Sequence, residues 1–188
     1  FLSQKKFPYC LAPLKTLGGD LVYQVDKLTG VIYPFIDGEI PEKNKHTCQE
    51  MGFALSLLHL VTLSGPGEVR RLRHYQSVGS PAEAIATYAH EARCPEDYRA
   101  AFKQIFPAGL GKILAPEYPV GLIHGDLYYD NCLFKQDKLL VLLDFEQSGV
   151  GQYIFDIGIS VSGSCLDAQG RIDGDLVRAF VEGYEKIR

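Results

Sequence analysis

A polar loop followed by a hairpin pattern lies in the second half of the chain. The loop 123–131 has the sequence I-H-G-D-L-Y-Y-D-N, and two short apolar runs flank the polar turn that comes next, at 133–134 and 139–143. Two apolar runs joined by a short polar turn are typical of a β-hairpin. Asn131 begins the first strand and Asp144 ends the second. An antiparallel hairpin is therefore expected to bring these two side chains next to each other.

The side chains at this end of the hairpin have the chemistry of a metal and phosphate site. Asn131 and Asp144 offer an amide oxygen and a carboxylate, which Mg²⁺ accepts as ligands together with phosphates and water. Asp126 lies five residues before Asn131, where it can face the metal without binding it. A carboxylate there can accept the proton of a substrate hydroxyl, and phosphoryl transfer needs little else beyond positioning and charge neutralisation.

The rest of the chain predicts an α+β fold, because its strands are segregated and do not alternate with helices. A T-x-x-E capping box at Thr47 and Glu50 starts a helix that is apolar on almost every face and is expected to be buried. That helix is predicted at about 47–63. The other predicted elements are strands at 21–25, 31–36 and 120–123 and helices at about 81–92, 96–106, 153–162 and 176–187. The stretch 149–151 is not a phosphate loop, since no third glycine opens a helix.

The composition describes a globular chain that does not bind nucleic acid. The 188 residues suit one domain or slightly more, and 46% of them are hydrophobic, enough for a core. A net charge of -4 argues against the basic surface of a nucleic-acid binder. The dense basic cluster at 70–74 reads as a solvated helix face, with a phosphate or acidic-substrate role as the alternative.

The cysteine pattern predicts a cytoplasmic protein. The five cysteines are scattered without a C-x-x-C pair, so reduced thiols are expected and neither a disulfide framework nor a zinc site. We expect no signal peptide, and the sequence has no apolar run of about 18 residues, so no membrane partner is expected. The chain begins at Phe1 and stops inside a predicted helix, and both ends are expected to be cuts in a longer protein.

The motif H-G-D-L-x-x-D-N at 124–131, followed by D-F at 144–145, resembles the aminoglycoside phosphotransferase and choline kinase superfamily. In overall layout the chain resembles the homoserine kinases of that group. The resemblance implies a protein-kinase-like fold, mainly the helical C-terminal lobe with the last strands of the N-terminal lobe. Residues 1–38 would be a remnant of the N-terminal lobe and the hinge, and 39–188 a helical catalytic lobe truncated at its C-terminus.

The resemblance also implies a role for each matching polar residue. Asp126 would be the catalytic base, and Asn131 and Asp144 would hold Mg²⁺. Glu146 would assist a second metal or the substrate side, although a structural role is an equal alternative. Asp156 would brace the catalytic loop.

The same resemblance implies a nucleotide site. The sequence Y-P-F-I-D-G at 33–38 matches the hinge between the lobes, where backbone groups around Phe35 and Ile36 would meet the adenine. Leu133 and Leu143 would line the floor of the adenine site. The expected cofactors are ATP and Mg²⁺.

The histidines are expected to be structural. His124 would support the loop near Asp156 as a hydrogen-bonded packing residue, because phosphoryl transfer does not need a second base beside Asp126. His46 and His59 lie near the two ends of the long apolar helix and have no carboxylates at ligand spacing. Neither is expected to bind a metal.

The resulting prediction is a small-molecule kinase that moves the γ-phosphoryl of ATP to a hydroxyl. The acceptor would be an amino alcohol, a hydroxy amino acid, an aminoglycoside or a sugar, and the oligomeric state stays open. The alternative is a truncated, non-catalytic kinase-like module that binds nucleotide or a partner, because a glycine-rich loop and strand lysine are not identifiable. This chain alone is therefore expected to be weakly active or inactive.

A protein kinase is disfavoured. Glu146, and not glycine, follows Asp144 and Phe145, and no A-P-E element comes later. Only the nine residues 146–154 separate Phe145 from Phe155. That is too little chain for an activation segment that docks a peptide.

Overall fold

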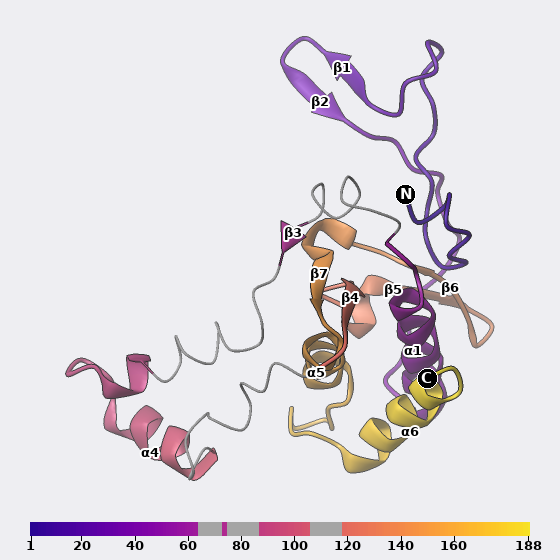
Figure 1. The fold of residues 1–188 in the computed structure, drawn as a ribbon. Coiled ribbons are helices and arrows are strands. Elements are labelled where there is room, and N and C mark those ends of the chain that lie inside the picture. The colour runs from indigo at the N-terminus through magenta and orange to yellow at the C-terminus, as the bar shows by residue number, and fades with distance from the viewer. Residues whose placement is uncertain (64–72, 75–86, 106–117) are drawn as a thin grey trace.

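The fold is described for residues 1–63, 73–74, 87–105 and 118–188 in a computed structural model (Figure 1). The described elements are β1 (Tyr23–Val25), β2 (Leu28–Gly30), α1 (Lys45–His59), β3 (Arg73–His74), α4 (Glu96–Ile105), β4 (Val120–Ile123), β5 (Cys132–Lys135), β6 (Lys138–Leu142), β7 (Gly149–Gln152), α5 (Tyr153–Ser164) and α6 (Gly174–Glu185). Two short 3₁₀ helices, η1 (Tyr129–Asn131) and η2 (Phe145–Gln147), lie before β5 and after β6. Small sheets and helices together make this an α+β fold, as expected.

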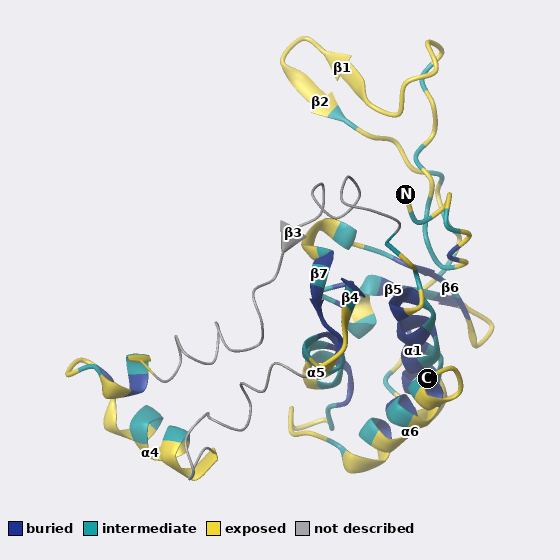
Figure 2. Ribbon diagram, viewed as in Figure 1, coloured by how far each residue is buried: buried dark blue, intermediate teal, exposed yellow. Residues whose placement is uncertain are grey.

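Helix α1 lies at the centre of the main body and is buried, as its apolar sequence predicts (Figure 2). Its start differs from the prediction. The cap is Asn44, whose side chain accepts a hydrogen bond from the Thr47 N–H at 3.0 Å while the Asn44 N–H donates to the Thr47 hydroxyl at 3.1 Å. The predicted box at Thr47 and Glu50 is therefore wrong, because Thr47 already lies in the first turn. The helix also ends at His59, earlier than residue 63.

Helices α1 and α6 touch through glycines. A Cβ added at Gly52 would lie 2.0 Å from the carbonyl oxygen of Phe180, and one at Gly183 would lie 1.9 Å from that of Gln49. No side chain fits at either point, so the two backbones pack directly against each other. The α6 end of the chain is thereby fixed against the helix that carries His59.

Strand β7 was not predicted from the sequence. Its residues pair antiparallel with β4, with Ile123 opposite Gly149, and parallel with the two residues of β3. The expectation that 149–151 is not a phosphate loop agrees with this strand. Arg73 and His74 form β3, so the helix predicted for the basic cluster is wrong for these two positions, and 70–72 lie outside the described residues.

The hairpin β5–β6 forms as predicted, with Cys132 opposite Leu142. Both of its edges are extended by residues near the N-terminus. Glu39 and Phe134 exchange two backbone hydrogen bonds of 2.8 Å, and the Leu142 N–H donates to the carbonyl of Tyr9 at 2.8 Å. The segment before α1 is thus held against the hairpin that precedes Asp144.

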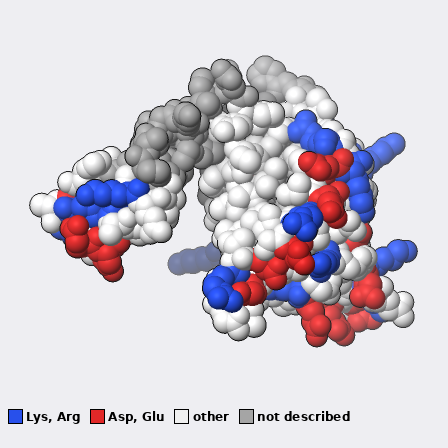
Figure 3. Space-filling model, turned by 90° about the horizontal axis from the view of Figure 1, so that it is seen from below, with Lys and Arg blue, Asp and Glu red and all other residues white. Residues whose placement is uncertain are grey.

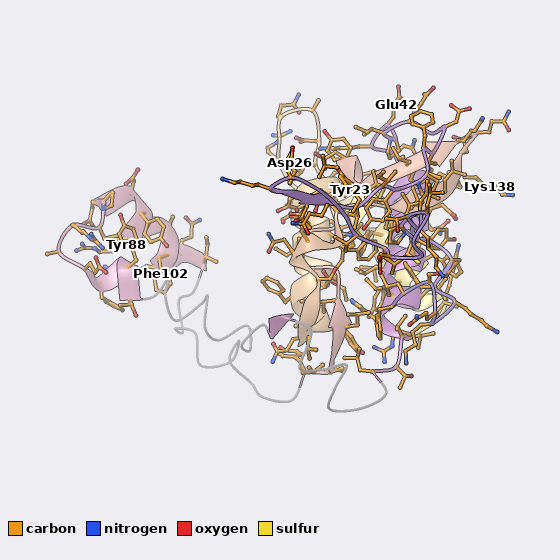
Figure 4. The ribbon with its side chains drawn as sticks, turned by 90° about the horizontal axis from the view of Figure 1, so that it is seen from above. Tyr23, Asp26, Glu42, Tyr88, Phe102 and Lys138 are labelled. Carbon is orange, nitrogen blue, oxygen red and sulfur yellow. The ribbon has the colours of Figure 1, made fainter. Side chains whose placement is uncertain are left out.

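The first hairpin is shorter than predicted and projects from the main body (Figure 1). Val25 pairs with Leu28, and Asp26 between them takes a positive φ of 55°. This two-residue turn pairs β1 with residues 28–30, which were predicted to be part of the turn, and the strand expected at 31–36 is wrong because no strand forms there. Seen from above, Tyr23 and Asp26 lie on this hairpin (Figure 4). Its side chains are exposed, including Leu28 at 72%.

Helix α4 lies apart from the main body (Figure 1) and confirms the helix predicted at 96–106 over its described part. The rings of Tyr88 and Tyr98 meet edge to face at 5.1 Å, and Tyr88 and Phe102 lie in this separate piece (Figure 4). Of the helix predicted at 81–92, residues 87–90 are helical, 91 and 92 are not, and 81–86 lie outside the described residues. No helix in the described ranges is both long and apolar enough to cross a membrane.

Candidate active site

The loop with Asp126 leaves the sheet at the end of β4. Ile123 is the last residue of that strand and is fully buried, which fixes the point where the loop begins. Gly125 has a φ of +82°, a left-handed conformation that glycine adopts without steric cost. The loop then closes through a 3.0 Å hydrogen bond from the Tyr128 N–H to the carbonyl of Asp126. Asp126 itself is half-buried.

Asp156 lies directly against this loop. It is in the first turn of α5 and is fully buried. One carboxylate oxygen accepts the N–H of His124 at 2.7 Å, and the other accepts the N–H of Gly125 at 2.8 Å. The carboxylate therefore binds the two residues that precede Asp126.

His124 joins the loop to the residues around Asp144. Its Nε2 lies 2.9 Å from the carbonyl oxygen of Leu143, and its ring packs against Phe145 at 4.5 Å. Because a carbonyl only accepts, Nε2 is the donor. Burial lowers the pKa of His124 although nearby carboxylates oppose this shift, so the ring is neutral at pH 7.

The hairpin brings Asn131 to the strand end that leads into Asp144. The Leu143 N–H donates to the Asn131 carbonyl at 2.8 Å. The side-chain nitrogen of Asn131 donates to the Asp126 carbonyl at 2.7 Å, which leaves its amide oxygen as the atom that could bind a cation. Asp144 is exposed and has left-handed backbone angles, with φ 56° and ψ 60°.

These oxygen ligands fit the demands of Mg²⁺. Among the described residues there is no group of three or more His, Cys, Asp or Glu side chains that could hold a metal. One amide and one carboxylate are enough for Mg²⁺, which usually takes one or two protein ligands and keeps phosphates and water. Glu146 lies two residues further, exposed, in η2.

The residues proposed for adenine are only partly brought together. Leu133 lies beside the hinge, because a Cβ added at Gly38 would be 3.1 Å from its Cβ. The Ile36 carbonyl accepts the Gly38 N–H at 3.0 Å. Leu143 is half-buried next to Asp144, whereas the side chain of Phe35 is 91% exposed. The structure therefore places the hinge against β5 and leaves the ring of Phe35 in solvent.

A cavity elsewhere on the main body shares no residue with this loop. Its volume is about 460 Å³, and it lies between the start of α1 and α6, lined by Lys45, His46, Gln49, Asp175, Arg178, Ala179 and Glu182. Lys45 and Asp175 form an exposed ion pair of 2.7 Å within it. Positively and negatively charged side chains are intermingled on the underside of the main body (Figure 3), so this face is neither uniformly acidic nor uniformly basic.

Sequence reasoning missed the partner of Asp156. His59, the last residue of α1, places its Nε2 3.0 Å from the carboxylate of Asp156 and its Nδ1 2.8 Å from the Tyr184 hydroxyl. No carboxylate lies near His59 in the sequence, and Asp156 follows 97 positions later, so the sequence predicts only a structural role for His59. A polar ring at the end of an otherwise apolar, buried helix was the available signal, since buried polar groups need partners.

The fold and this loop define a kinase-like phosphotransferase. The chain belongs to the phosphotransferase enzyme family, whose sequence model matches residues 2–188. A homoserine kinase from Pseudomonas aeruginosa is 30% identical over 189 residues, and one from Methylobacterium radiotolerans is 28% identical over 180 residues. The alignments cover 96% and 95% of this chain but 55% of each relative, so the chain spans about half the length of these relatives.

Solved structures share the protein-kinase-like fold. A spectinomycin phosphotransferase in complex with ADP and spectinomycin superposes with a TM-score of 0.69 at 18% identity, covering 100% of this chain and 62% of that one. A choline/ethanolamine kinase family protein from Mesorhizobium loti superposes with a TM-score of 0.63 at 17% identity, covering 98% of this chain and 56% of its own. At these identities the likeness concerns the fold.

Proposed function

We propose that this chain provides the catalytic site of an ATP-dependent kinase that phosphorylates the hydroxyl of a small molecule. The observation that carries the proposal is the hydrogen bond from the Asn131 side chain to the Asp126 carbonyl, which ties the candidate base to a candidate metal ligand. Residues 39–188 would form the catalytic lobe, and 1–38 would contribute the hinge and part of the N-terminal lobe.

Each polar residue at the loop has a distinct proposed task. Asp126 accepts the proton of the attacking hydroxyl, and Asn131 and Asp144 would hold Mg²⁺, which supplies charge neutralisation on the phosphates. Glu146 is exposed, two residues after Asp144, and would face the second metal or the acceptor. His124 is neutral and bonded to a carbonyl, so it positions the loop and leaves proton transfer to Asp126.

The nucleotide would bind where the hinge meets β5. Backbone groups around Phe35 and Ile36 would hold the adenine, and Leu133 and Leu143 would form its apolar floor. The contact between Gly38 and Leu133 supports this placement, because it sets hinge and floor side by side.

Homoserine is the acceptor that we propose first. The relatives at 28% and 30% identity, each aligned over at least 95% of this chain, are homoserine kinases. Homoserine is a hydroxy amino acid, which is one of the acceptor classes that the family resemblance implies. Because the alignments cover 55% of each relative, the activity should be measured on this chain and on the longest polypeptide that its gene encodes.

The test is release of ADP from Mg-ATP in the presence of homoserine. Choline, ethanolamine, an aminoglycoside and a simple sugar are tested separately as alternative acceptors. We expect homoserine to stimulate release and Asp126→Asn to lower kcat by about 10²–10⁴-fold, the usual contribution of a general base. Asn has nearly the same size, so the thermal midpoint should stay close to that of the unaltered chain. Undiminished kcat in Asp126→Asn would contradict the role of this residue, and nucleotide binding without turnover with any acceptor would favour a binding module.

A further inference from the structure

Three residues from three helices form a hydrogen-bonded chain next to the Asp126 loop, in which two members are buried and Tyr184 is half-buried. His59 ends α1, Asp156 lies in the first turn of α5, and Tyr184 lies near the end of α6. His59 is 2% exposed and Asp156 is fully buried. Polar groups that are buried in this way are costly unless they are bonded, so the chain must be satisfied internally.

The protons of this chain can be assigned from the partners. A carboxylate accepts, so Nε2 of His59 carries the proton and donates to Asp156 at 3.0 Å. Nδ1 then accepts from the hydroxyl of Tyr184 at 2.8 Å. Burial lowers the pKa of His59 although Asp156 opposes this shift, so the ring is neutral at pH 7. Nε2 is then its one N–H donor.

The ring of His59 is held on several sides. It stacks on Tyr153 with 4.2 Å between ring centroids, and the Tyr153 hydroxyl donates to the carbonyl of His59 at 2.9 Å. Tyr184 follows Gly183, where the backbones of α6 and α1 touch. The hydroxyl that donates to His59 is thus carried by a helix whose distance from α1 is fixed.

The far end of the chain reaches the loop. Asp156 uses both carboxylate oxygens for the N–H groups of His124 and Gly125. The oxygen that binds His124 is also the one that accepts from His59. A carboxylate without the His59 donor could rotate away from one of its two backbone partners, since a side chain with fewer bonds has more accessible rotamers.

We propose that His59 and Tyr184 are positioning residues, which hold the Asp156 carboxylate so that it fixes the backbone on which Asp126 sits. Neither touches the reacting atoms. The consequence for the reaction rests on the proposed function, whereas the effect on the loop does not. Helix α6, which has no residue in the candidate site, thereby becomes part of the support of that site.

A matched pair of substitutions separates positioning from packing. In His59→Gln the side-chain nitrogen falls near the place of Nε2 and can still donate to Asp156, whereas in His59→Asn it falls near Nδ1 and cannot. We expect His59→Asn to lower kcat about tenfold with KM for ATP changed less than about threefold, because one buried hydrogen bond is lost away from the ligands. His59→Gln should recover most of this loss.

Amide hydrogen exchange tests the loop without turnover. Exchange of the His124 and Gly125 N–H groups should speed up about tenfold in His59→Asn and stay near the original rate in His59→Gln, because local opening becomes easier only when the donor is lost. Tyr184→Phe keeps the ring and removes the hydroxyl, so a smaller change of about threefold is expected in the same direction. His46→Asn, at the exposed start of the same helix, is the control and should change neither amide.

The outcomes are distinct. Unchanged exchange of both amides in folded His59→Asn and in Tyr184→Phe overturns the proposal, and if His59→Asn does not fold, Tyr184→Phe alone decides it. Faster exchange together with absent ADP release for every acceptor, in this chain and in the longest polypeptide that its gene encodes, supports the brace and rejects the proposed function. An equal loss of kcat in the Asn and Gln variants would show that packing of the ring, and not its donor, is what matters, and would also overturn it.

Discussion

Asp144 combines an exposed carboxylate with a backbone that L-residues rarely adopt. Its φ of 56° and ψ of 60° lie in the left-handed region, which non-glycine residues occupy at a cost of order 1 kcal/mol. Asp pays less than most residues because its short polar side chain can bond locally. Such strain at a candidate metal ligand agrees with a residue retained for its carboxylate.

Two substitutions at Asp144 separate these properties. Asp144→Gly and Asp144→Ala both remove the carboxylate, so both should abolish the strengthening of nucleotide binding by Mg²⁺, which we expect to be at least tenfold in the unaltered chain. Only alanine is strained at this φ, so Asp144→Ala should be less stable than Asp144→Gly by about 1 kcal/mol. Calorimetric titration with ADP, with and without Mg²⁺, and urea unfolding measure the two effects. Mg²⁺-dependent binding that persists in both variants would exclude Asp144 as a ligand.

The sequence allowed some of these residues to be placed and not others. Asn131 could be predicted to lie beside the residue that precedes Asp144, because both flank one hairpin and hairpin pairing is local. His59 and Asp156 could not be paired, because they are 97 positions apart in the sequence and meet through the packing of α1 against α5. Local patterns determine turns and strand ends, whereas contacts across helices depend on the complete tertiary fold.

The same limit applies to whole elements. The buried helix α1 was predictable because apolar residues cover almost every face beyond its first turn, and such a surface is stable only when most of the helix is buried. Strand β7 was not, because G-V-G-Q has only one residue that favours strands, and its pairing with β4 and β3 is what makes it extended. On the partner strand β4, Gly121, which lies opposite Gly151, is required by packing, since the side chain of Tyr153 occupies the space where its Cβ would lie.

The contact between α1 and α6 gives a prediction at the level of elements. Gly183→Ala places a methyl group 1.9 Å from the backbone oxygen of Gln49, so the helices must move apart and we expect a loss of about 1–3 kcal/mol. Gly158→Ala in α5 is the matched control, because a Cβ there meets nothing within 4 Å. In that exposed helical position alanine should stabilise the chain by about 0.5–1 kcal/mol. The measurement is the urea midpoint of unfolding for each variant and for the unaltered chain. Equal shifts in the two variants would show that the helices do not touch at Gly183.

At the scale of the whole molecule, stability is concentrated in one part of the chain. The core is built from α1, β4 to β6, α5 and α6, together with Phe7, while the first hairpin and α4 contribute no buried large side chain to it (Figure 2). The neutral histidines His59 and His124 lie inside this core, each bonded to an acceptor. Protonation of either ring would place a charge where burial disfavours it.

The core should therefore be sensitive to mild acid. Both pKa values are lowered from 6.5 by burial, so as pH falls below about 6.5 the unfolded chain binds protons that the folded chain does not. Stability is fully present above that pH and falls below it, by up to about 1.4 kcal/mol per pH unit for each histidine. The carboxylates of Asp37, Asp167 and Asp175 have pKa values lowered by their hydrogen-bond partners, and their contributions are lost only below about pH 4. Urea unfolding at pH 7.5, 6.5 and 5.5 should show the decline, and His59→Gln should reduce its slope by about half. A free energy of unfolding that stays constant down to pH 5.5 would mean that the two rings are not neutral and buried in solution.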